Sequence, residues 1–468
     1  MNLLLIPSST DAHQHFLKTL PKPCKARPIC KYFFIVAGLS ILTCSQVHAW
    51  QFYGGSSARH IALGGGPINP YLRDVMRTHV NPAQLASDSN AVWGDLGYLA
   101  TDVNNGGSRY QYLGTGIQVT DKLDVGLILN KRESPLYIVD PGSPAMDPID
   151  EINGYTASVL GFGSGLFGRP MSPVELVGAY RAASSDFGAS LTYGGWKNTR
   201  SGTDNLEESV RTLRLKLGII APSLPQSALL DASVILGINT VHGSYTSSGQ
   251  TGTLSMDGGA EFGIDVRLEG KLNDRWTIVP RVRWYTFGWE LDQVNNGIPA
   301  YPNPSSEYGR DEFEVGIGEN YATEKVLVVG GVSYQRIALS SNYRSGSSQT
   351  KTTVTTEDLP NINVGIEIRL GSWIVGRIGY FDRLASTETE TVSPSGQTTT
   401  TISSELPWYG DPNGFSAAQQ RLTLGLGIIV ANVSLDGTVG EGYFLSGPWP
   451  LSGTSQQMFG VVSMNFHF

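Results

Sequence analysis

From residue 90 to its end, the chain repeats segments of roughly nine to fourteen residues in which apolar and polar side chains alternate. In the segment GAEFGIDVRLEG, Phe262 and Ile264 fall on one face, whereas Glu261 and Asp265 fall on the other, because side chains of a strand point alternately to its two faces. The final segment, VVSMNFHF, keeps this period up to Phe468. The alternation predicts β-strands that each have one apolar and one polar face.

The connections between these segments are alternately short and long. Short turns are expected at residues 120–122, 184–186, 223–226, 273–275, 322–324, 371–373 and 431–432. Long loops are expected at residues 132–173, 197–208, 243–258, 290–310, 341–359, 384–418 and 442–455, and the Thr- and Ser-rich stretch 387–404 is expected to lack fixed structure. Short turns on one side and long loops on the other are typical of outer-membrane barrels, and these turns predict about 16 strands. The expected fold is all-β, a transmembrane antiparallel β-barrel of roughly 14 to 16 strands.

Aromatic residues at the strand ends support a membrane setting. Trp276 and Trp284 share the apolar face of RWTIVPRVRWYTF. At about 3.3 Å per residue and a tilt near 40°, their spacing climbs roughly 20 Å, close to the height of an apolar band of roughly 25 Å between two aromatic girdles. The core tryptophans of a soluble sandwich have no reason to keep that spacing. We expect Trp276 and Trp284 in the membrane girdle, and Phe466 and Phe468 in a C-terminal signal that the barrel assembly machinery reads.

The polar faces contain opposite charges at positions that can pair across strands. If residues 273–275 form a tight loop, Asp265 faces Arg283 and Arg267 faces Arg281. The alternative is a sheet face that contacts only water, but a narrow barrel interior needs such pairing more. We therefore predict a charged ladder on the inner wall, which either holds a plug or lines an aqueous pore: Arg214, Lys216, Glu261, Asp265, Arg267, Arg281, Arg283, Glu367, Arg369 and Arg377.

The first 49 residues are expected to be a secretory signal peptide. A basic stretch precedes the apolar run YFFIVAGLSIL, and Val47 and Ala49 stand at the small-residue positions before Trp50. The apolar run is too short for a membrane anchor, which needs about 20 residues. A lipoprotein site at Cys44 is disfavoured because the preceding Thr43 is bulky. All three cysteines lie in this leader, so we expect no disulfide and no thiol chemistry in the mature chain.

Composition and motifs exclude several functions. The net charge is −8 and the leader is basic, so a nucleic-acid partner is not expected. No apolar run of about 18 residues follows the leader, which excludes helical spans. Neither a metal-ligand spacing of histidines nor a phosphate loop is present, and His242 with Ser244 is better explained as polar loop residues than as a catalytic pair. We expect no catalytic residue, no metal, no cofactor and no enzyme activity.

Residues 50–89 do not alternate and are expected to form a plug or hatch ahead of the barrel, residues 90–468. They contain a glycine cluster and a short helical stretch near residues 71–79. A loop-rich leader of this size must lie in the periplasm or fold into the lumen. In the lumen it would give the inner charges a partner.

A spaced set of residues in this segment resembles the opening of a known family. The set is Ala58-Arg59, Leu63-Gly64, Gly66, Asp74, Asn81-Pro82-Ala83, Leu85 and Ala86. It is similar to the start of the outer-membrane long-chain fatty acid transporter (FadL-like) family and its PorV-like relatives. The stretches GIGENY and VLVVGGVSY are also similar to hairpins of that group. The resemblance implies a barrel of about 14 strands with an N-terminal plug, and it implies ligand or plug roles for Arg59, Leu63, Gly64, Gly66, Asp74, Asn81, Pro82 and Ala83.

The resemblance also implies a function in the bacterial outer membrane. Hydrophobic small molecules, fatty-acid-like compounds or hydrocarbons, would enter from outside, bind in the barrel, and leave past the plug or sideways through the wall. The expected partners are outer-membrane lipid and such a molecule. Two other classes stay open, because a charge-rich inner wall does not suit a uniformly apolar tunnel. One is a non-transporting PorV-like secretion anchor or surface-loop adhesin, and the other is a general aqueous porin.

Overall fold

The computed structural model describes residues 56–64, 69–88, 90–97, 112–130, 174–201, 204–223, 228–247, 250–296, 304–345, 348–405, 421–439 and 459–468. Within these ranges, no helix is long and apolar enough to cross a membrane. The predicted signal peptide lies outside the described residues, as do Gly66 and the loops predicted at residues 132–173 and 442–455.

Three short helical elements precede the strands: α3 (Ser57–Ala62) and the 3-10 turns η1 (Val75–His79) and η2 (Pro82–Ala86). The strands are β1 (Ala91–Gly97), β2 (Tyr112–Gln118), β3 (Leu123–Asn130), β4 (Val174–Ala182), β5 (Ser185–Arg200), β6 (Asp204–Ser223), β7 (Ala228–Ser247), β8 (Gln250–Lys271), β9 (Trp276–Asn296), β10 (Pro304–Ala322), β11 (Val326–Ser345), β12 (Ser348–Arg369), β13 (Ile374–Val392), β14 (Thr398–Glu405), β15 (Arg421–Val430), β16 (Val433–Val439) and β17 (Phe459–His467).

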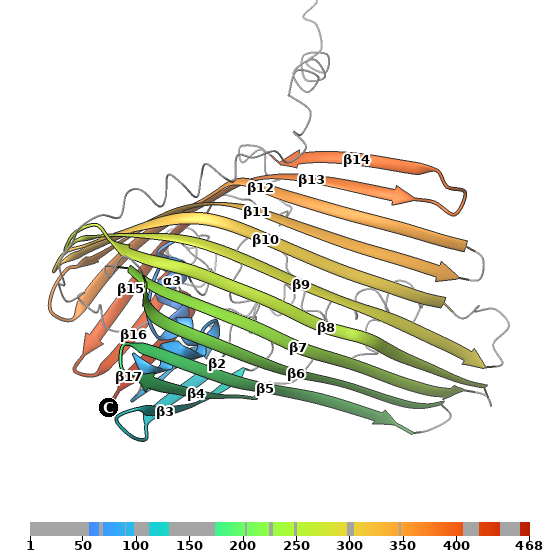
Figure 1. The fold of residues 1–468 in the computed structure, drawn as a ribbon, viewed down its shortest axis with the longest axis horizontal. Coiled ribbons are helices and arrows are strands. Elements are labelled where there is room, and N and C mark those ends of the chain that lie inside the picture. The colour runs from blue at the N-terminus through green and yellow to red at the C-terminus, as the bar shows by residue number, and fades with distance from the viewer. Residues whose placement is uncertain are drawn as a thin grey trace, which may run out of the picture. The chain divides into compact units, whose positions relative to one another are not determined.

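The strands form one antiparallel sheet that closes on itself (Figure 1). Each strand pairs with the next along the chain, except that β13 pairs with both β14 and β15. β14 is therefore a side branch that extends the sheet beside the outer part of β13. The ring closes where β1 pairs with β17, with Ala91 opposite His467. The wall thus has 16 strands, and the predicted antiparallel β-barrel is confirmed.

Short turns join the strands at the end of the barrel where β1 begins and β17 finishes, which we call the turn end. They lie at residues 119–122, 183–184, 272–275, 323–325, 370–373 and 431–432, at or next to six of the predicted short turns. The seventh predicted turn, between β6 and β7, falls largely on residues outside the described ranges. We call the opposite end the loop end.

At the loop end, most of the predicted long loops are strand, and this corrects the prediction. β5 and β6 are separated only by residues 201–203, and β7 and β8 only by residues 248–249. The Thr- and Ser-rich stretch 387–404 belongs largely to β13 and β14, not to a loop without structure. Beyond the lipid both faces of a strand can contact water, so the apolar alternation ends while the backbone pairing continues. Threonine also favours strands.

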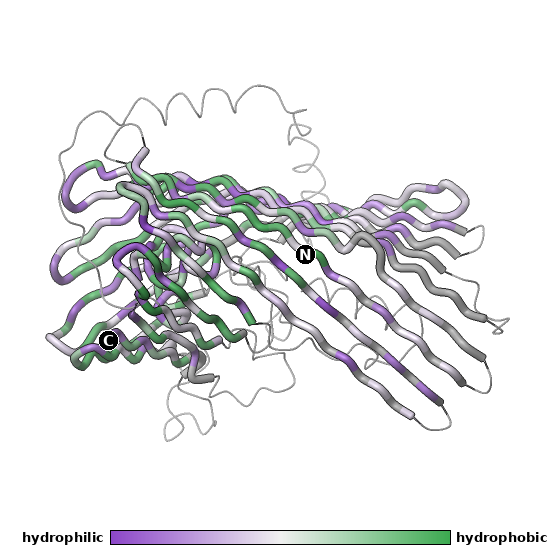
Figure 2. The backbone as a smooth tube through the Cα atoms, turned by 60° about the horizontal axis from the view of Figure 1, so that its bottom comes forward, coloured by the Kyte–Doolittle hydropathy of each residue, from purple (hydrophilic) through white to green (hydrophobic). Residues whose placement is uncertain are grey.

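Large apolar side chains are exposed on the outer face of the barrel. Figure 2 shows that apolar residues, in green, gather in the half of the barrel nearer the turn end. Examples are Leu191 of β5, Leu215 of β6 and Phe313 of β10. Trp276 and Trp284 of β9 are 37% and 44% exposed on the same face. Soluble proteins rarely expose so extensive an apolar surface, whereas lipid tails cover it around a closed barrel. The wall therefore spans a membrane.

Many side chains on the inner face of the wall are charged or polar and are buried. Lys216, Glu261 and Arg267 are each exposed by 3% or less. Buried charges of this kind are stable only with partners. Residues 56–64 and 69–88, which we call the N-terminal segment, lie against this face and supply many of those partners.

Candidate functional site

Side-chain caps shape the N-terminal segment. The Oγ atom of Ser56 precedes α3 and accepts a hydrogen bond from the Arg59 backbone N–H over 3.1 Å. Asp74 caps η1 and Asn81 caps η2, each by accepting from the backbone N–H two residues further on. Such oxygens satisfy backbone donors that have no partner inside a helix. The caps fix where each turn begins, and with it the direction of the charged side chains that follow.

α3 lies where the first and last strands meet. Asp95 of β1 and Ser463 of β17 are partners in register. The Ser57 and Ser463 hydroxyls both donate to Asp95 Oδ1, the latter over 2.6 Å. The Ala58 backbone N–H donates to Ser463 Oγ over 3.1 Å. α3 therefore bridges β1 and β17 from inside, and we call the junction of β16, β17 and β1 the seam.

Next to these contacts, a chain of ion pairs links α3 to β12, β13 and β16. Arg59 Nε donates to Glu367 Oε2 over 2.8 Å, and Arg377 Nε donates to the same oxygen over 2.6 Å. Arg377 Nη1 then donates to Asp436 Oδ1 over 2.7 Å. The other oxygen of Asp436 accepts from Ser56 Oγ over 2.8 Å. All four charged side chains are almost fully buried, so each depends on the others.

Asp74 ties α3 to η1 within the N-terminal segment. Its Oδ2 atom accepts from Arg59 Nη1 over 3.0 Å and lies 2.7 Å from His60 Nε2. His60 Nδ1 accepts the Asn69 backbone N–H over 2.8 Å, so the proton of the neutral ring is on Nε2 and points to Asp74. Burial alone would raise the pKa of Asp74, but His60 and Arg59 outweigh it and lower that pKa to about 2. Asp74 is therefore ionised at neutral pH.

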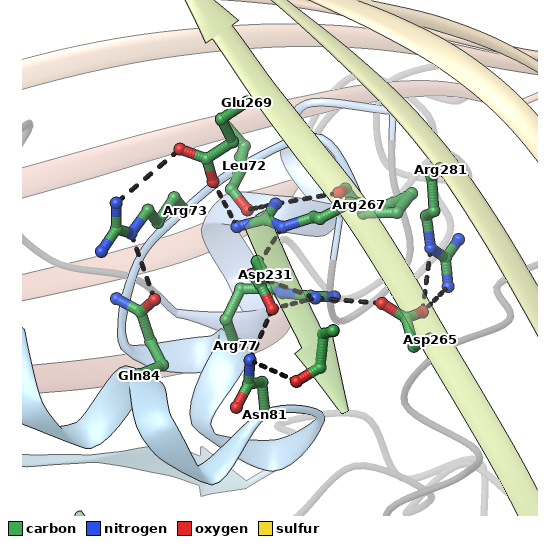
Figure 3. Close-up of polar contacts among 12 residues, drawn as sticks. Leu72, Arg73, Arg77, Asn81, Gln84, Asp231, Asp265, Arg267, Glu269 and Arg281 are labelled. Atoms are coloured by element: carbon green, nitrogen blue, oxygen red, sulfur yellow. Dashed lines mark hydrogen bonds and ion pairs between the residues drawn. The ribbon is translucent and has the colours of Figure 1, made fainter. Parts of the chain in front are cut away.

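A second set of contacts joins η1 and η2 to strands β6 to β10, which we call the far wall (Figure 3). Arg77 Nη2 donates to Asp265 Oδ1 over 3.1 Å and to both oxygens of Asp231 over 3.3 Å. Asn81 Nδ2 donates to Asp231 Oδ1 over 2.6 Å. Arg77 is 1% exposed, so the two aspartates provide the negative charge that its burial requires.

The far-wall carboxylates also have partners within the wall. Arg267 Nε donates to Asp231 Oδ2 over 2.7 Å, and Arg281 Nη2 donates to Asp265 Oδ2 over 2.7 Å. Arg281 Nη1 also donates to Glu314 Oε2 over 2.9 Å. This network would keep its charges paired if the N-terminal segment were absent.

Register alone does not decide these ion pairs. Asp265 stands opposite Arg283, and Arg267 stands opposite Arg281, as the expected tight loop requires. The ion pair nevertheless joins Asp265 to Arg281 on the diagonal, which the length of an arginine side chain permits. Arg283 pairs instead with Glu312 of β10 over 3.2 Å.

Lys216 of β6 holds the end of η1. Its Nζ atom pairs with Glu175 Oε1 over 2.5 Å and donates to the His79 carbonyl over 2.8 Å. The Trp93 indole N–H donates to His79 Nε2 over 3.4 Å, so the proton of the imidazole is on Nδ1. Burial, together with the Lys216 cation, lowers the pKa of His79 to about 3. His79 is therefore neutral at pH 7.

Glycines of the wall let the backbone of the N-terminal segment approach the strands. A Cβ on Gly379 of β13 would overlap the backbone nitrogen of Gly64, and a Cβ on Gly188 of β5 would overlap the backbone of Ala83. Gly64 itself has a φ of +75°, which glycine adopts without strain. Larger residues at the wall positions would displace the segment.

Tyr71 is seated between β10 and β11 in the same way. Its ring occupies the space that Cβ atoms of Gly318 and Gly331 would need. Asn320 Nδ2 donates to the Tyr71 carbonyl over 2.8 Å, and Arg267 Nη1 donates to the carbonyl of Leu72 over 2.7 Å. Burial raises the pKa of Tyr71, so its hydroxyl is neutral.

Two apolar clusters complete the contact between the segment and the wall. The larger one contains Val75, Met76, Val80, Leu85, Ala86, Ala91, Trp93, Tyr112, Ile128, Val177 and Ala179. The smaller one contains Leu63, Tyr71, Leu72, Val279, Leu327 and Val329. The first lies against β1 to β4, and the second lies against β9 and β11.

The structure places the sequence-predicted site residues in three groups. In the N-terminal segment lie Arg59, Leu63, Gly64, Asp74, Asn81, Pro82 and Ala83. Buried in the wall are Glu261, Asp265, Arg267, Arg281, Arg283, Glu367 and Arg377, while Arg369 is half-buried. Exposed are Trp276, Trp284, Phe466 and Phe468. In the described ranges, no group of three or more His, Cys, Asp or Glu side chains could hold a metal ion.

Several residues that hold the segment are not found by sequence reasoning. Ser57, Asp95 and Ser463 were not among the expected site residues, although aligning β1 with β17 would have placed the last two opposite each other. Arg77 carries no local signal, because its partners lie more than 150 residues away. Tyr71 could have been found only by matching an aromatic ring to glycines on two distant strands.

Comparisons with known proteins find likeness only among solved structures. No family model matches the chain, and no curated protein gives a significant match. The Pseudomonas putida toluene transporter TodX is 12% identical at a TM-score of 0.37, covering 91% of this chain and 100% of TodX. The TodX deltaS2S3 mutant, a monoaromatic hydrocarbon channel, is 11% identical at a TM-score of 0.37, covering 87% and 98%. The ferric yersiniabactin uptake receptor FyuA from Yersinia pestis is 9% identical at a TM-score of 0.35, covering 81% and 80%.

The chain is thus similar to solved membrane transport barrels at low identity. At these identities and TM-scores, the likeness says nothing of what this chain binds or passes.

Proposed function

We propose that this chain is a plugged barrel of the bacterial outer membrane through which hydrophobic small molecules cross. The solutes are fatty-acid-like compounds or hydrocarbons. The N-terminal segment is the plug, residues 90–468 are the channel, and Phe466 and Phe468 belong to the signal for the barrel assembly machinery.

The observation that carries this proposal is that strands all around the wall contact the N-terminal segment. It is bonded to β1, β16 and β17 at the seam, to β7 and β8 on the far wall, and it is seated against glycines of β5, β10, β11 and β13. The inner charges are paired with one another or with this segment. Such a lumen favours a plugged transporter over a general aqueous porin.

Two features support a hydrophobic solute. The apolar cluster around Met76, Trp93 and Tyr112 is buried between the segment and β1 to β4, so a movement of the segment would uncover apolar side chains for a passing solute. Residues 58–86 resemble the opening of the FadL-like family. TodX is a toluene transporter, and the same class of solute is proposed here on the strength of this chain's residues.

Uptake by cells tests the proposed solute class. A strain that lacks this protein should lose most of its uptake of a labelled hydrophobic tracer, such as toluene or a long-chain fatty acid, and the wild-type chain should restore it. Uptake of a labelled polar solute of similar size is the control and should not change. Equal uptake of the hydrophobic tracer with and without the protein would contradict the proposal.

Conductance in planar bilayers tests the plug. If the N-terminal segment is a plug, the wild-type protein should show small, infrequent openings. A variant whose seat is obstructed, Gly379→Ala, should conduct more, since the added Cβ overlaps the Gly64 backbone. A large and steady conductance in the wild type would favour a general aqueous porin.

One observation favours a second role, a non-transporting secretion anchor or adhesin. Strands β5 to β14 extend at the loop end as paired, polar β-sheet, which could bind a protein outside the cell. This role predicts that cells without the protein lose surface display of secreted proteins while uptake of the hydrophobic tracer is unchanged.

A further inference from the structure

The closing pair of strands, β1 and β17, is not joined by a turn, whereas most other pairs of the wall follow each other directly along the chain. Consecutive strands are joined by turns or loops that restrain their register. β1 and β17 are the first and last strands of the wall, and nearly the whole barrel lies between them in the chain. Their pairing closes the longest loop and has the highest cost in chain entropy, so it is expected to form late. A contact other than a turn must set their register.

The N-terminal segment supplies such a contact. Asp95 and Ser463 are register partners, and Ser57 donates to Asp95 while the Ala58 N–H donates to Ser463. A slip by one residue would turn the Asp95 carboxylate to the lipid face. A slip by two would place Asp95 opposite Asn465 or Val461, and the pair of contacts to α3 would be lost. Only the native register satisfies both strands and α3 together.

We infer that residues 56–59 are a registration clamp for barrel closure, so that the wall closes only around a seated N-terminal segment. Ser57 and Ala58 hold β1 against β17, Ser56 holds β16 through Asp436, and Arg59 holds β12 through Glu367. The barrel wall then closes and its lumen is blocked by the N-terminal segment in the same step. A barrel of this chain does not reach its native closed form with an empty lumen, which protects the cell from leaky pores during assembly. The inference does not depend on which solute crosses the barrel.

The far wall does not need such a clamp. Asn81 contacts Asp231 and backbone carbonyls of β6 and β7, and these two strands follow each other along the chain. Asn81 is as deeply buried as Ser57. It is therefore a matched control, because it binds the segment to the wall at a place where the chain itself sets the register.

Cysteine pairs on the outer face can report the register of the seam. In a chain whose three cysteines are replaced by serine, Val92→Cys with Phe466→Cys joins positions that are partners in the native register. Val92→Cys with Met464→Cys reports a slip of two residues, since Met464 is the partner of Gly94. Strand partners lie within the Cα range that a disulfide can bridge. The chains are refolded into detergent micelles and oxidised, and the disulfide yield is measured by mass spectrometry.

The full chain should form the native disulfide and little of the slipped one. The variant with Ser57→Ala and Ser463→Ala should lose native yield roughly tenfold, since several buried hydrogen bonds are removed, and deletion of residues 50–89 should lose at least as much. Asn81→Ala should keep the native yield. Native yields equal to that of the full chain in both the double variant and the deletion would overturn the clamp.

Bilayer recordings separate this result from the proposed function. A deletion chain that forms the native disulfide and leaks would overturn the clamp while supporting the plug. A deletion chain that forms the native disulfide and does not leak would overturn both. If the deletion chain forms little of the native disulfide, the clamp is supported, and the conductance of Gly379→Ala then decides the plug.

Discussion

The seam and the far wall both bind the N-terminal segment through buried carboxylates, but they differ in where the opposing groups come from. On the far wall, Asp231 and Asp265 each have an arginine of the wall, Arg267 or Arg281, and Arg77 of the segment is a third cation. The far wall can therefore keep its charges paired alone.

Next to the seam, on β12, β13 and β16, Arg377 is shared between Glu367 and Asp436, and the remaining partners come from the segment. These are Arg59 for Glu367 and Ser56 for Asp436. The described strands also differ, since β1 has 7 residues and β8 has 22. Contacts with the N-terminal segment therefore add to ion pairs that the far wall already has, whereas the carboxylates next to the seam need them.

Removing one arginine from each region should show this difference most strongly. Arg59→Met should lower the free energy of unfolding by about 3–5 kcal/mol, because Asp74 and Glu367 lose a buried cation. Arg77→Met should cost about 1–3 kcal/mol, because Arg267 and Arg281 still pair with its two aspartates. Urea denaturation in detergent micelles, followed by tryptophan fluorescence, measures both. Equal losses would mean that the two regions do not differ in the way proposed.

Replacing a wall glycine that packs against the N-terminal segment by alanine should have the next largest effect on stability. Gly379→Ala should cost about 1–3 kcal/mol, since the backbone of Gly64 must move to make room. Gly178→Ala on β4 is the matched control, because nothing lies within 4 Å of its added Cβ. Thermal unfolding of the two variants should separate them by several degrees. An unchanged midpoint for Gly379→Ala would show that this seat is not tightly packed.

Acid should weaken the contact at Lys216 before it weakens the Arg59 cluster. The pKa of His79 is about 3 in the folded chain and about 6.5 when unfolded, so the unfolded chain binds more protons between these values. Stability therefore falls as pH falls through this window, by at most about 1.4 kcal/mol per pH unit. The pKa of Asp74, about 2, lies below the unfolded value of about 3.8, so its contribution is lost only as pH falls from near 4 towards 2.

The variant His79→Asn separates these two windows. It should flatten the dependence of the unfolding midpoint on pH between 6.5 and 5, and it should leave the loss below pH 4 in place. If His79→Asn keeps the wild-type dependence of the unfolding midpoint on pH between 6.5 and 5, a group other than His79 causes the loss of stability in that range.

The apolar contact on β1 to β4 should be the most tolerant. Met76→Leu nearly conserves volume and removes only the approach of the Tyr112 hydroxyl to the sulfur atom, 2.8 Å away. It should cost less than about 1 kcal/mol, as volume-conserving core substitutions do. A loss in urea denaturation larger than that of Arg77→Met would show that the apolar cluster, not the ionic contacts, dominates the hold on the segment.

Much of the wall can be predicted from sequence, because the signals are local. Alternation reaches from residue to residue, so the faces of β8 and β9 follow from the sequence, and a tight turn between Lys271 and Trp276 then sets which residues face each other. The loop ends of the strands could not be predicted. There both faces are polar, and pairing continues without a hydrophobic pattern to reveal it.

The candidate site could be predicted only in part. Arg59, Asp74 and Asn81 stand in a motif that resembles a known family, but nothing near them in the sequence names their partners. Diagonal ion pairs such as Asp265 with Arg281 depend on side-chain reach, which register does not decide. Tyr71 depends on glycines of two other strands.

The sequence by itself determined that this chain forms a closed antiparallel barrel with a charged interior, because alternation and turn spacing act over a few residues. Only the tertiary structure decided which wall carboxylate each group of the N-terminal segment takes. Ser56 and Asp436, for instance, are 380 residues apart in the chain and hydrogen-bonded in space. Burial makes every such charge depend on a partner, and the closed wall decides which partners come within reach.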